Sequence, residues 1–225
     1  YCMNLENMCK WAVIDFDIPK RILENCNTAK DKEENIKNIF EIVKKVYENS
    51  IKFGIHPVIE NSGNKGAHIW YFFNKPVKAV IIRKALHKII KKIDADIIKN
   101  VSIEIFPKQD ELSDKKLGNL VKLPIGIHKK TLKRSFFTDV SGVPYKNQLE
   151  YLMNIKRDLT EENMLGIIEL ENSQKINENE MTKIIKTDDE EEIKKIEERE
   201  PFENTELKEL ISKCSVIENM VNKIR

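Results

Sequence analysis

The sequence predicts an α/β or α+β fold in which helices pack against a mixed β-sheet. Short apolar segments with the composition of strands alternate with two long segments whose apolar residues recur every three to four positions. The chain has 225 residues, of which 40% are hydrophobic, so it is long enough to bury a sizeable core. We expect a compact region over residues 1–170, a charged linker over 171–201 and an amphipathic helix over 202–225.

Six segments have the composition of β-strands. Each is short, rich in β-branched or aromatic residues, and bounded by glycine, proline or polar residues. Pro19 closes the first, and an aromatic run that begins at Trp70 ends the third. The six expected strands are residues 11–17, 57–60, 67–73, 101–106, 118–123 and 134–138.

Residues 30–53 and 77–93 have the apolar periodicity of amphipathic helices. Apolar residues keep helical spacing in the first segment, and Gly54 stands where a C-terminal cap is expected. The second combines an apolar face with a strongly basic one, which is either a solvated surface or a contact for a nucleic-acid template. Residues 146–170 are expected to be helical and to end the compact region.

The net charge of +2 is distributed unevenly along the chain. Residues 1–157 hold 29 Lys and Arg against 18 Asp and Glu, a net charge of +11. Residues 158–225 hold 10 against 19, a net charge of −9. Only the first part has the charge of a polyanion binder, so nucleic acid is its expected partner. The acidic part is expected to be a linker and a docking helix.

Nothing in the sequence predicts export or membrane insertion. It has no basic start followed by an apolar stretch, and no apolar run approaches the ~18–20 residues of a membrane span. The four cysteines form no C-x-x-C pair, so we expect reduced thiols in a cytoplasmic protein without a membrane partner. Because the chain begins at Tyr1, we expect a piece of a longer protein. A metal site completed by further residues is the alternative for the cysteines.

Three acidic residues are candidate metal ligands. Alternate side chains of a strand point to one face, about 6.5–7 Å apart, so the carboxylates of Asp15 and Asp17 can converge on divalent cations. Two solvated acids at an exposed strand end are the alternative. Glu104 stands between apolar neighbours in another expected strand, where a carboxylate is costly unless it is paired, solvated or bound to metal. Pairing with a lysine is the alternative there.

A glycine-rich loop before the aromatic strand is a candidate phosphate site. Gly63 and Gly66 allow the backbone to approach a phosphate closely, while Ser62 and Lys65 supply a hydroxyl and a cation. His68 opens the next strand and can donate to a phosphate oxygen. The spacing is not that of a P-loop. A glycine-rich hairpin with a hydrogen-bonded histidine is the alternative.

A basic loop follows near the end of the compact region. Apolar residues and glycines are interleaved with six basic or histidine side chains, and no acid occurs among them. This composition favours a shaped polyanion site over a surface that only increases solubility. The six residues are Lys122, His128, Lys129, Lys130, Lys133 and Arg134.

The order and spacing of these motifs resemble the archaeo-eukaryotic primase superfamily of primase-polymerases. The motifs are D-h-D, S-G-x-[KR]-G-x-H, an acid after an apolar residue, and a basic L-P-x-x-x-H loop. The resemblance spans about residues 9–155 and is closest to catalytic domains of prokaryotic defence systems, including CRISPR-associated primase-polymerases. It implies an RRM-like sheet with helices, joined to a second small α/β unit, with the active site in the cleft between them. Residues 202–225 resemble the start of the helical domain that often follows.

The resemblance also implies an activity and its site. The activity is template-dependent addition of dNTPs or NTPs to a primer on single-stranded DNA or RNA, including synthesis of the primer itself. Asp15, Asp17 and Glu104 match the positions that hold two Mg²⁺ or Mn²⁺ ions. The glycine-rich loop, from Ser62 to His68, matches positions that bind the nucleotide phosphates. In the basic loop, Lys122 and His128 match positions near the triphosphate or the 5′ end of the primer, and the other four basic residues are expected to contact nucleic acid.

The chain departs from the family pattern at two places. Lys65 and Lys122 stand where members often carry Arg, which keeps the positive charge but loses bidentate geometry. Thr131 and Leu132 stand where many members have Thr-Gly, so the shape of that turn is left open.

Two other classes of protein account for part of the pattern. A metal-dependent nuclease would use the three acids and Lys108, but it leaves the glycine-rich loop without a role. A catalytically silent module that binds single-stranded nucleic acid on an RRM-like scaffold would use the basic loop. Against it, the aromatic residues from Trp70 to Phe73 stand in an apolar strand, not on an evident stacking platform. Acids at all three metal positions also favour an enzyme.

Overall fold

A computed structural model describes residues 1–113, 118–129 and 131–170 of the chain. These residues belong to one compact unit. The expected linker over 171–201 and the expected helix over 202–225 lie outside the described residues, so both stay predictions. Within the described part of the chain, no helix combines the length and apolar character needed to cross a bilayer.

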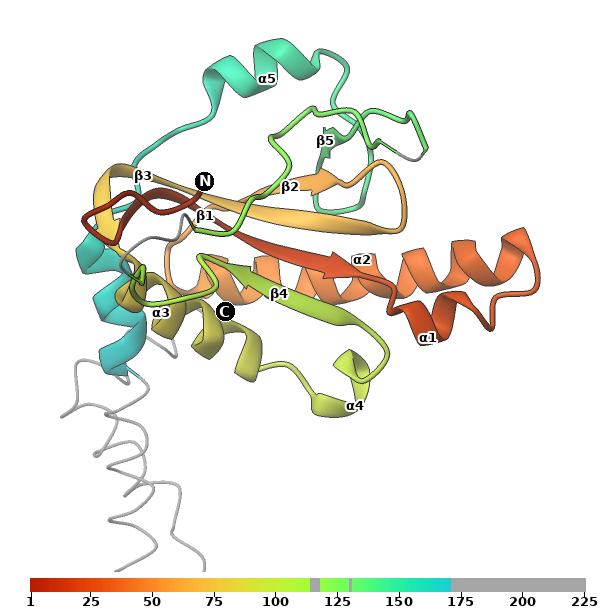
Figure 1. The fold of residues 1–225 in the computed structure, drawn as a ribbon, viewed down its shortest axis with the longest axis horizontal. Helices are drawn as coiled ribbons and strands as arrows, with labels where there is room; N and C mark the ends of the chain where they lie inside the picture. The colour runs from red at the N-terminus through yellow and green to blue at the C-terminus, as the bar shows by residue number, and fades with distance from the viewer. Residues whose placement is uncertain (114–117, 130, 171–225) are drawn as a thin grey trace, which may run out of the picture. The chain divides into compact units, whose positions relative to one another are not determined.

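Five strands form a single antiparallel sheet in the order β4-β1-β3-β2-β5 (Figure 1). The two longest strands, β1 and β3, pair along most of their lengths at its centre. The sequence predicted a mixed sheet, and this was wrong, because all four strand pairings are antiparallel. The strands are β1 Met8–Asp17, β2 Val58–Asn61, β3 Gly66–Lys78, β4 Ser102–Phe106 and β5 Phe136–Thr138.

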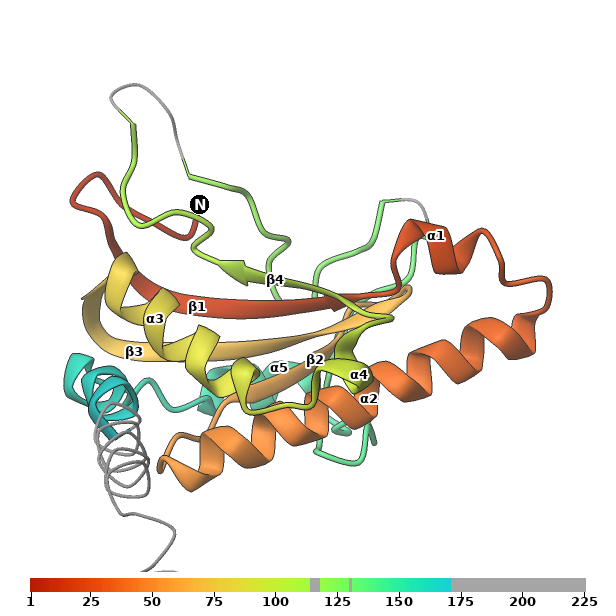
Figure 2. The ribbon, with the colours of Figure 1, turned by 90° about the horizontal axis from the view of Figure 1, so that it is seen from below.

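Two long helices, α2 and α3, pack against one face of this sheet, and the segment that follows β4 lies over the other face (Figure 2). A complete capping box at Thr28 and Asp31 starts α2. Gly54, at φ 71°, follows its end, as the sequence predicted. The helices are α1 Lys20–Leu23, α2 Ala29–Lys52, α3 Ala79–Lys91, α4 Ala95–Ile98 and α5 Gln148–Asn154, and residues 161–170 are also helical.

The alternation of β1 separates core from site. Ala12, Ile14 and Phe16 are fully buried among the apolar residues of the helix-covered face. Asp15 and Asp17 therefore lie on the opposite face. Burial of the helix-facing side chains fixes the register of β1, because a shift by one residue would place both carboxylates in the core.

The sequence located the longest elements well and the region after β4 poorly. Residues 118–123 were expected to form a strand, but they pair with none of the described strands. Their apolar side chains Leu120 and Leu123 are exposed, so the alternation there reflects an irregular loop. The helical segment expected over 146–170 is interrupted, because residues 155–160 are not helical.

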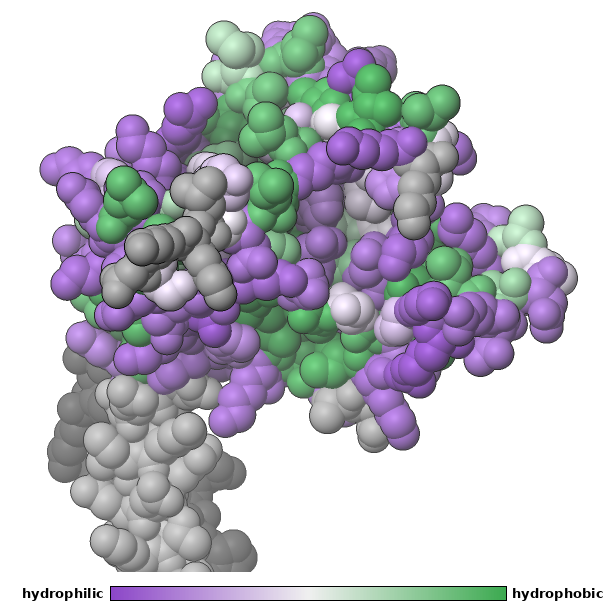
Figure 3. Space-filling model, in the orientation of Figure 1, coloured by the Kyte–Doolittle hydropathy of each residue, from purple (hydrophilic) through white to green (hydrophobic). Residues whose placement is uncertain are grey.

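The second small α/β unit is not separated from the rest. β5 pairs with β2 and so belongs to the main sheet, and the described residues contain no second sheet. The segment between β4 and β5 exposes hydrophobic as well as hydrophilic side chains, and the two are interleaved on the surface (Figure 3). Among the described residues of this segment, the exposed large apolar ones are Leu120, Leu123, Ile127 and Leu132.

Candidate active site

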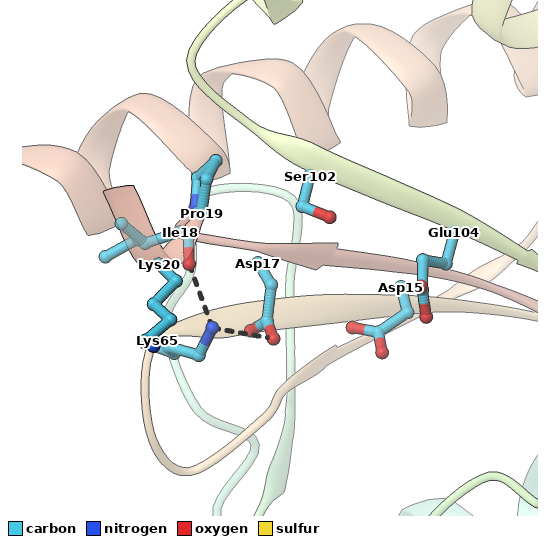
Figure 4. Close-up of a pocket in the computed structure, with 8 residues that line it drawn as sticks. All are labelled: Asp15, Asp17, Ile18, Pro19, Lys20, Lys65, Ser102 and Glu104. Atoms are coloured by element: carbon cyan, nitrogen blue, oxygen red, sulfur yellow. Dashed lines mark hydrogen bonds and ion pairs between the residues drawn. The ribbon is translucent and has the colours of Figure 1, made fainter. Parts of the chain in front are cut away.

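The three predicted metal ligands line one pocket of about 170 Å³. Strand pairing places Glu104 of β4 directly opposite Asp15 of β1, and Ser102 opposite Asp17. Figure 4 shows these side chains coming from adjacent strands, with Lys65 reaching in from the loop before β3. The structure thus brings together residues that are about 90 positions apart in the sequence.

A row of four ionisable side chains crosses the sheet through Asp15. Cross-strand pairing places Glu104, Asp15, His68 and Glu60 side by side on β4, β1, β3 and β2. Nε2 of His68 lies 3.5 Å from Oδ1 of Asp15, and Nδ1 of His68 lies 2.7 Å from Oε2 of Glu60. His68, predicted to bind phosphate, thus lies between two carboxylates and is buried.

Two of the three pocket acids are paired with lysines. Nζ of Lys65 lies 3.0 Å from Oδ2 of Asp17 and also donates to the carbonyl of Ile18. Nζ of Lys108 lies 2.9 Å from Oε2 of Glu104, so the lysine partner considered for that residue is present. In this arrangement no group of three His, Cys, Asp or Glu within the described residues is assembled to hold a metal ion.

The electrostatics of the pocket nevertheless suit a divalent cation. Burial raises the pKa of Asp15 to about 6; the nearby His68 opposes this shift, and the negative charges of Asp17 and Glu104 add to it. Carboxylate oxygens are the ligands that Mg²⁺ and Mn²⁺ prefer, and a cation between them relieves their mutual repulsion. The donor set fits such ions, provided that Lys65 and Lys108 leave the oxygens they now contact.

The glycine-rich loop forms a tight turn stabilised by Ser62. Its hydroxyl accepts a hydrogen bond from the backbone N–H of Gly66 at 3.1 Å, and it is buried. A Cβ on Gly66 would lie 1.9 Å from the carbonyl oxygen of Phe16, so only glycine permits this approach of β3 to β1. Ser62 thus shapes the loop in this structure, while Lys65 is the loop residue that reaches the acidic pocket.

The basic loop packs directly against the glycine-rich loop. Nζ of Lys122 donates to the carbonyl of Ser62 at 2.7 Å. Nδ2 of Asn64 lies 3.5 Å from Nε2 of His128. Burial lowers the pKa of Lys122, against the opposing effect of the acids at positions 60, 15 and 17. The two loops that the sequence marked separately therefore form one surface beside the pocket.

The remaining basic residues lie farther out on this surface. Lys129 and Lys133 are exposed. Arg134 is also exposed, but its guanidinium donates to the carbonyl of Ile125 at 2.8 Å, so it supports the loop as well. Lys130 lies outside the described residues.

Sequence reasoning missed Glu60, which is fully buried at the end of the row. Its carboxylate accepts hydrogen bonds from Nδ1 of His68 at 2.7 Å, Nε1 of Trp70 at 2.9 Å and the backbone N–H of Ile125 at 2.8 Å. Burial alone would raise its pKa, but the hydrogen bond and charge of His68 and the other donors hold the pKa below its usual value. The sequence does contain a pattern that indicates such a residue, because Glu60 follows the apolar residues Val58 and Ile59 in an expected strand. The same pattern, an acid beside apolar neighbours, identified Glu104 as a candidate.

Comparison with protein families assigns most of the chain. Residues 1–166 match the family described as the archaeo-eukaryotic primase domain of TOTE conflict systems. The curated proteins contain no significant match to the chain. The matched family is that of TOTE conflict systems, so the association with CRISPR systems stays a prediction. The match spans nearly all described residues, including every strand of the sheet and both loops beside the pocket, and the chain therefore belongs to the archaeo-eukaryotic primase domain family of TOTE conflict systems.

Proposed function

We propose that this chain is the catalytic domain of a primase-polymerase. It would synthesise primers on single-stranded DNA or RNA and extend them by template-dependent transfer of nucleotides from dNTPs or NTPs, with release of pyrophosphate. Family membership supports a primase-type enzyme. The observation that carries the proposal is the convergence of Asp15, Asp17 and Glu104 on one pocket, with Lys65 at its edge.

The three carboxylates are the proposed ligands of two Mg²⁺ or Mn²⁺ ions. When bound, such ions would activate the primer 3′-hydroxyl and neutralise charge on the triphosphate. Asp15 and Asp17 are held by β1, whose buried face fixes their direction. Lys65 and Lys108 balance the charges of Asp17 and Glu104 until metal and nucleotide replace them. Positioning and electrostatics would supply most of the rate enhancement.

The two packed loops are the proposed binding site for the nucleotide phosphates. Lys65 would move from Asp17 to a phosphate oxygen, while Lys122 and His128 approach from the other loop. Gly63 and Gly66 would let the loop backbone approach the phosphates closely, although in this structure their N–H groups donate to Asn61 and Ser62. In this proposal the substrate would occupy a cleft between the sheet and the segment that joins β4 to β5.

Nucleic acid would bind along the outer part of the basic loop. Lys129, Lys130, Lys133 and Arg134 are the proposed phosphate contacts for template and primer. The exposed apolar side chain of Leu132 stands between Lys129 and Lys133 in the sequence, where it would contact bases while the lysines contact phosphates.

A primer-extension assay tests the proposal. Purified protein is given a single-stranded template, labelled dNTPs or NTPs, and Mg²⁺ or Mn²⁺, with and without a primer. We expect extension that is lost in the double variant Asp15→Ala, Asp17→Ala and kept in Glu33→Gln, which changes an exposed acid on α2. Products made without a primer establish priming.

Two results of the same assay would contradict the polymerase. Degradation of the template would identify a nuclease. Retention of the template without any product, under all metal and nucleotide conditions, would leave a binding module.

A further inference from the structure

Glu60 joins the sheet to the basic loop through a fully buried carboxylate. Two of its donors, His68 and Trp70, stand on the neighbouring strand β3. The third is the backbone N–H of Ile125, which lies between β4 and β5 and is 65 residues away in sequence. One side chain therefore contacts both the row of ionisable residues and the loop that faces it.

Only a carboxylate can accept all three hydrogen bonds. Oε2 accepts from His68 and Trp70, and Oε1 accepts from Ile125. A glutamine has a single oxygen, so its amide nitrogen would have to face one of these donors. Buried donors left without an acceptor are costly, which explains an ionised group in this apolar setting.

The loop is held at Ile125 in a conformation that a β-branched residue rarely adopts. Ile125 has a φ of 58°, in the left-handed region, and its side chain is 8% exposed. Glu60 accepts from its N–H, and Arg134 donates to its carbonyl at 2.8 Å. Hydrogen bonds thus fix the peptide groups on both sides of this residue, as strained positions require.

Lys122 and His128 stand three residues before and three residues after Ile125. Both lie against the glycine-rich loop, Lys122 through the carbonyl of Ser62 and His128 beside Asn64. A shift of Ile125 would move both side chains relative to the pocket. The contact with Glu60 is therefore placed where it controls the separation of the two loops.

We infer that Glu60 is a positioning residue that fixes His68 and the basic loop around the site of the nucleotide phosphates. Its role in nucleotide binding rests on the proposed function. The link between Glu60 and the loop does not, because it is a property of the protein without substrate. The two parts are tested by different measurements.

The variant Glu60→Gln tests the link. Its amide oxygen is expected to stay with His68 and Trp70, which leaves the amide nitrogen facing the N–H of Ile125. By NMR, hydrogen exchange at the Ile125 amide should become at least tenfold faster, while amides of β1 and β3 exchange within twofold of the wild-type rate. Unchanged exchange at Ile125, or equal acceleration throughout the sheet, would overturn the inference.

Nucleotide kinetics test the positioning role. In Glu60→Gln we expect the KM for the incoming nucleotide to rise at least fivefold, with a smaller fall in kcat. Faster exchange at Ile125 with an unchanged KM would overturn the positioning role. An inactive wild-type protein would contradict the proposed function instead, and the exchange experiment would still decide the link.

Two further variants keep the test decisive. If Glu60→Gln does not fold, Glu60→Asp retains the charge but is one methylene shorter, so it too should release the Ile125 amide. Thr138→Val is the matched control. Its buried hydroxyl forms no hydrogen bond with the described residues, and Thr138 pairs with Ile59, so it points away from the Glu60 face. This control should leave both exchange at Ile125 and KM unchanged.

Discussion

The carboxylate of Asp17 lies 3.0 Å from the ammonium group of Lys65, inside the pocket that also contains Asp15 and Glu104. Lys65 belongs to the glycine-rich loop, and Asp17 ends β1, so this ion pair joins the proposed phosphate site to the proposed metal site. A cation bound to Asp17 and the ammonium of Lys65 would compete for the same oxygen. This competition leads to a prediction that separates metal binding from nucleotide binding.

Replacing Lys65 by methionine should strengthen metal binding and weaken nucleotide binding. Removing one positive charge beside Asp17 should raise the affinity for Mn²⁺ roughly 3- to 10-fold. Affinity for the triphosphate should fall, since Lys65 is its proposed partner. Both are measured by titration calorimetry. Lys20→Met is the control, because Lys20 lines the same pocket but pairs with Glu24, which directly follows α1. Parallel loss of both affinities would contradict the competition.

Asp15→Asn should stabilise the fold while it removes activity. The pKa of Asp15 is raised from 3.8 to about 6 in the folded protein, mainly by burial. Between these values the folded state holds a proton that the unfolded state has lost, so the wild-type protein loses stability as the pH rises through this window. Above pH about 6 the carboxylate of Asp15 is ionised in the folded protein, and the full free-energy cost of burying its charge applies. The asparagine variant carries no charge at this position and avoids that cost.

Denaturant unfolding at two pH values measures this effect. At pH 8 we expect Asp15→Asn to be more stable than the wild-type protein by about 1–3 kcal/mol. The gain should shrink toward zero as the pH approaches 4. A variant that is less stable than the wild-type protein at pH 8 would show that the interaction of Asp15 with His68 outweighs the cost of burial.

Gly66→Ala should destabilise the protein by more than about 3 kcal/mol. The new methyl group would meet the carbonyl oxygen of Phe16 at 1.9 Å, and this oxygen belongs to the central strand β1. Gly166→Ala is the matched control. Gly166 lies in the helical residues 161–170 with open space at its Cβ position. Alanine there should therefore raise the free energy of unfolding by about 0.5–1 kcal/mol. Thermal unfolding of both variants measures the difference, and similar melting temperatures would contradict the close approach of β1 and β3.

Lys133→Gln should weaken the binding of single-stranded DNA equally for all sequences. Lys133 is exposed, and the loop uses only its backbone N–H and carbonyl, so the substitution leaves the local hydrogen bonds in place. If its ammonium contacts a phosphate, the slope of log K against log salt should decrease by about 0.7. Fluorescence anisotropy at several salt concentrations measures the slope. Lys37→Gln, on the exposed face of α2, is the control, and an equal change in both variants would place Lys133 outside the interface.

Local patterns in the sequence were enough to predict the helices and strands that bury one face and expose the other. The helical spacing of apolar residues predicted α2 and α3 to within two residues at each end, because burial of an apolar stripe selects that period. Alternation in β1 likewise predicted that Asp15 and Asp17 share a face. The strand predicted over residues 118–123 was wrong, because apolar alternation forms a strand only beside a partner, and none of the described strands pairs with these residues.

The residues of the candidate site could be predicted from the sequence, but the contacts between them could not. Motif order marked the acids, the glycine-rich loop and the basic loop, since each carries its chemistry within a few consecutive residues. The row through Asp15 and His68, the lysine partners of the acids, and the link from Glu60 to Ile125 depend on the register of four strands and on the path of a long loop. These relationships join residues tens of positions apart, and only packing of the whole chain determines which of them meet.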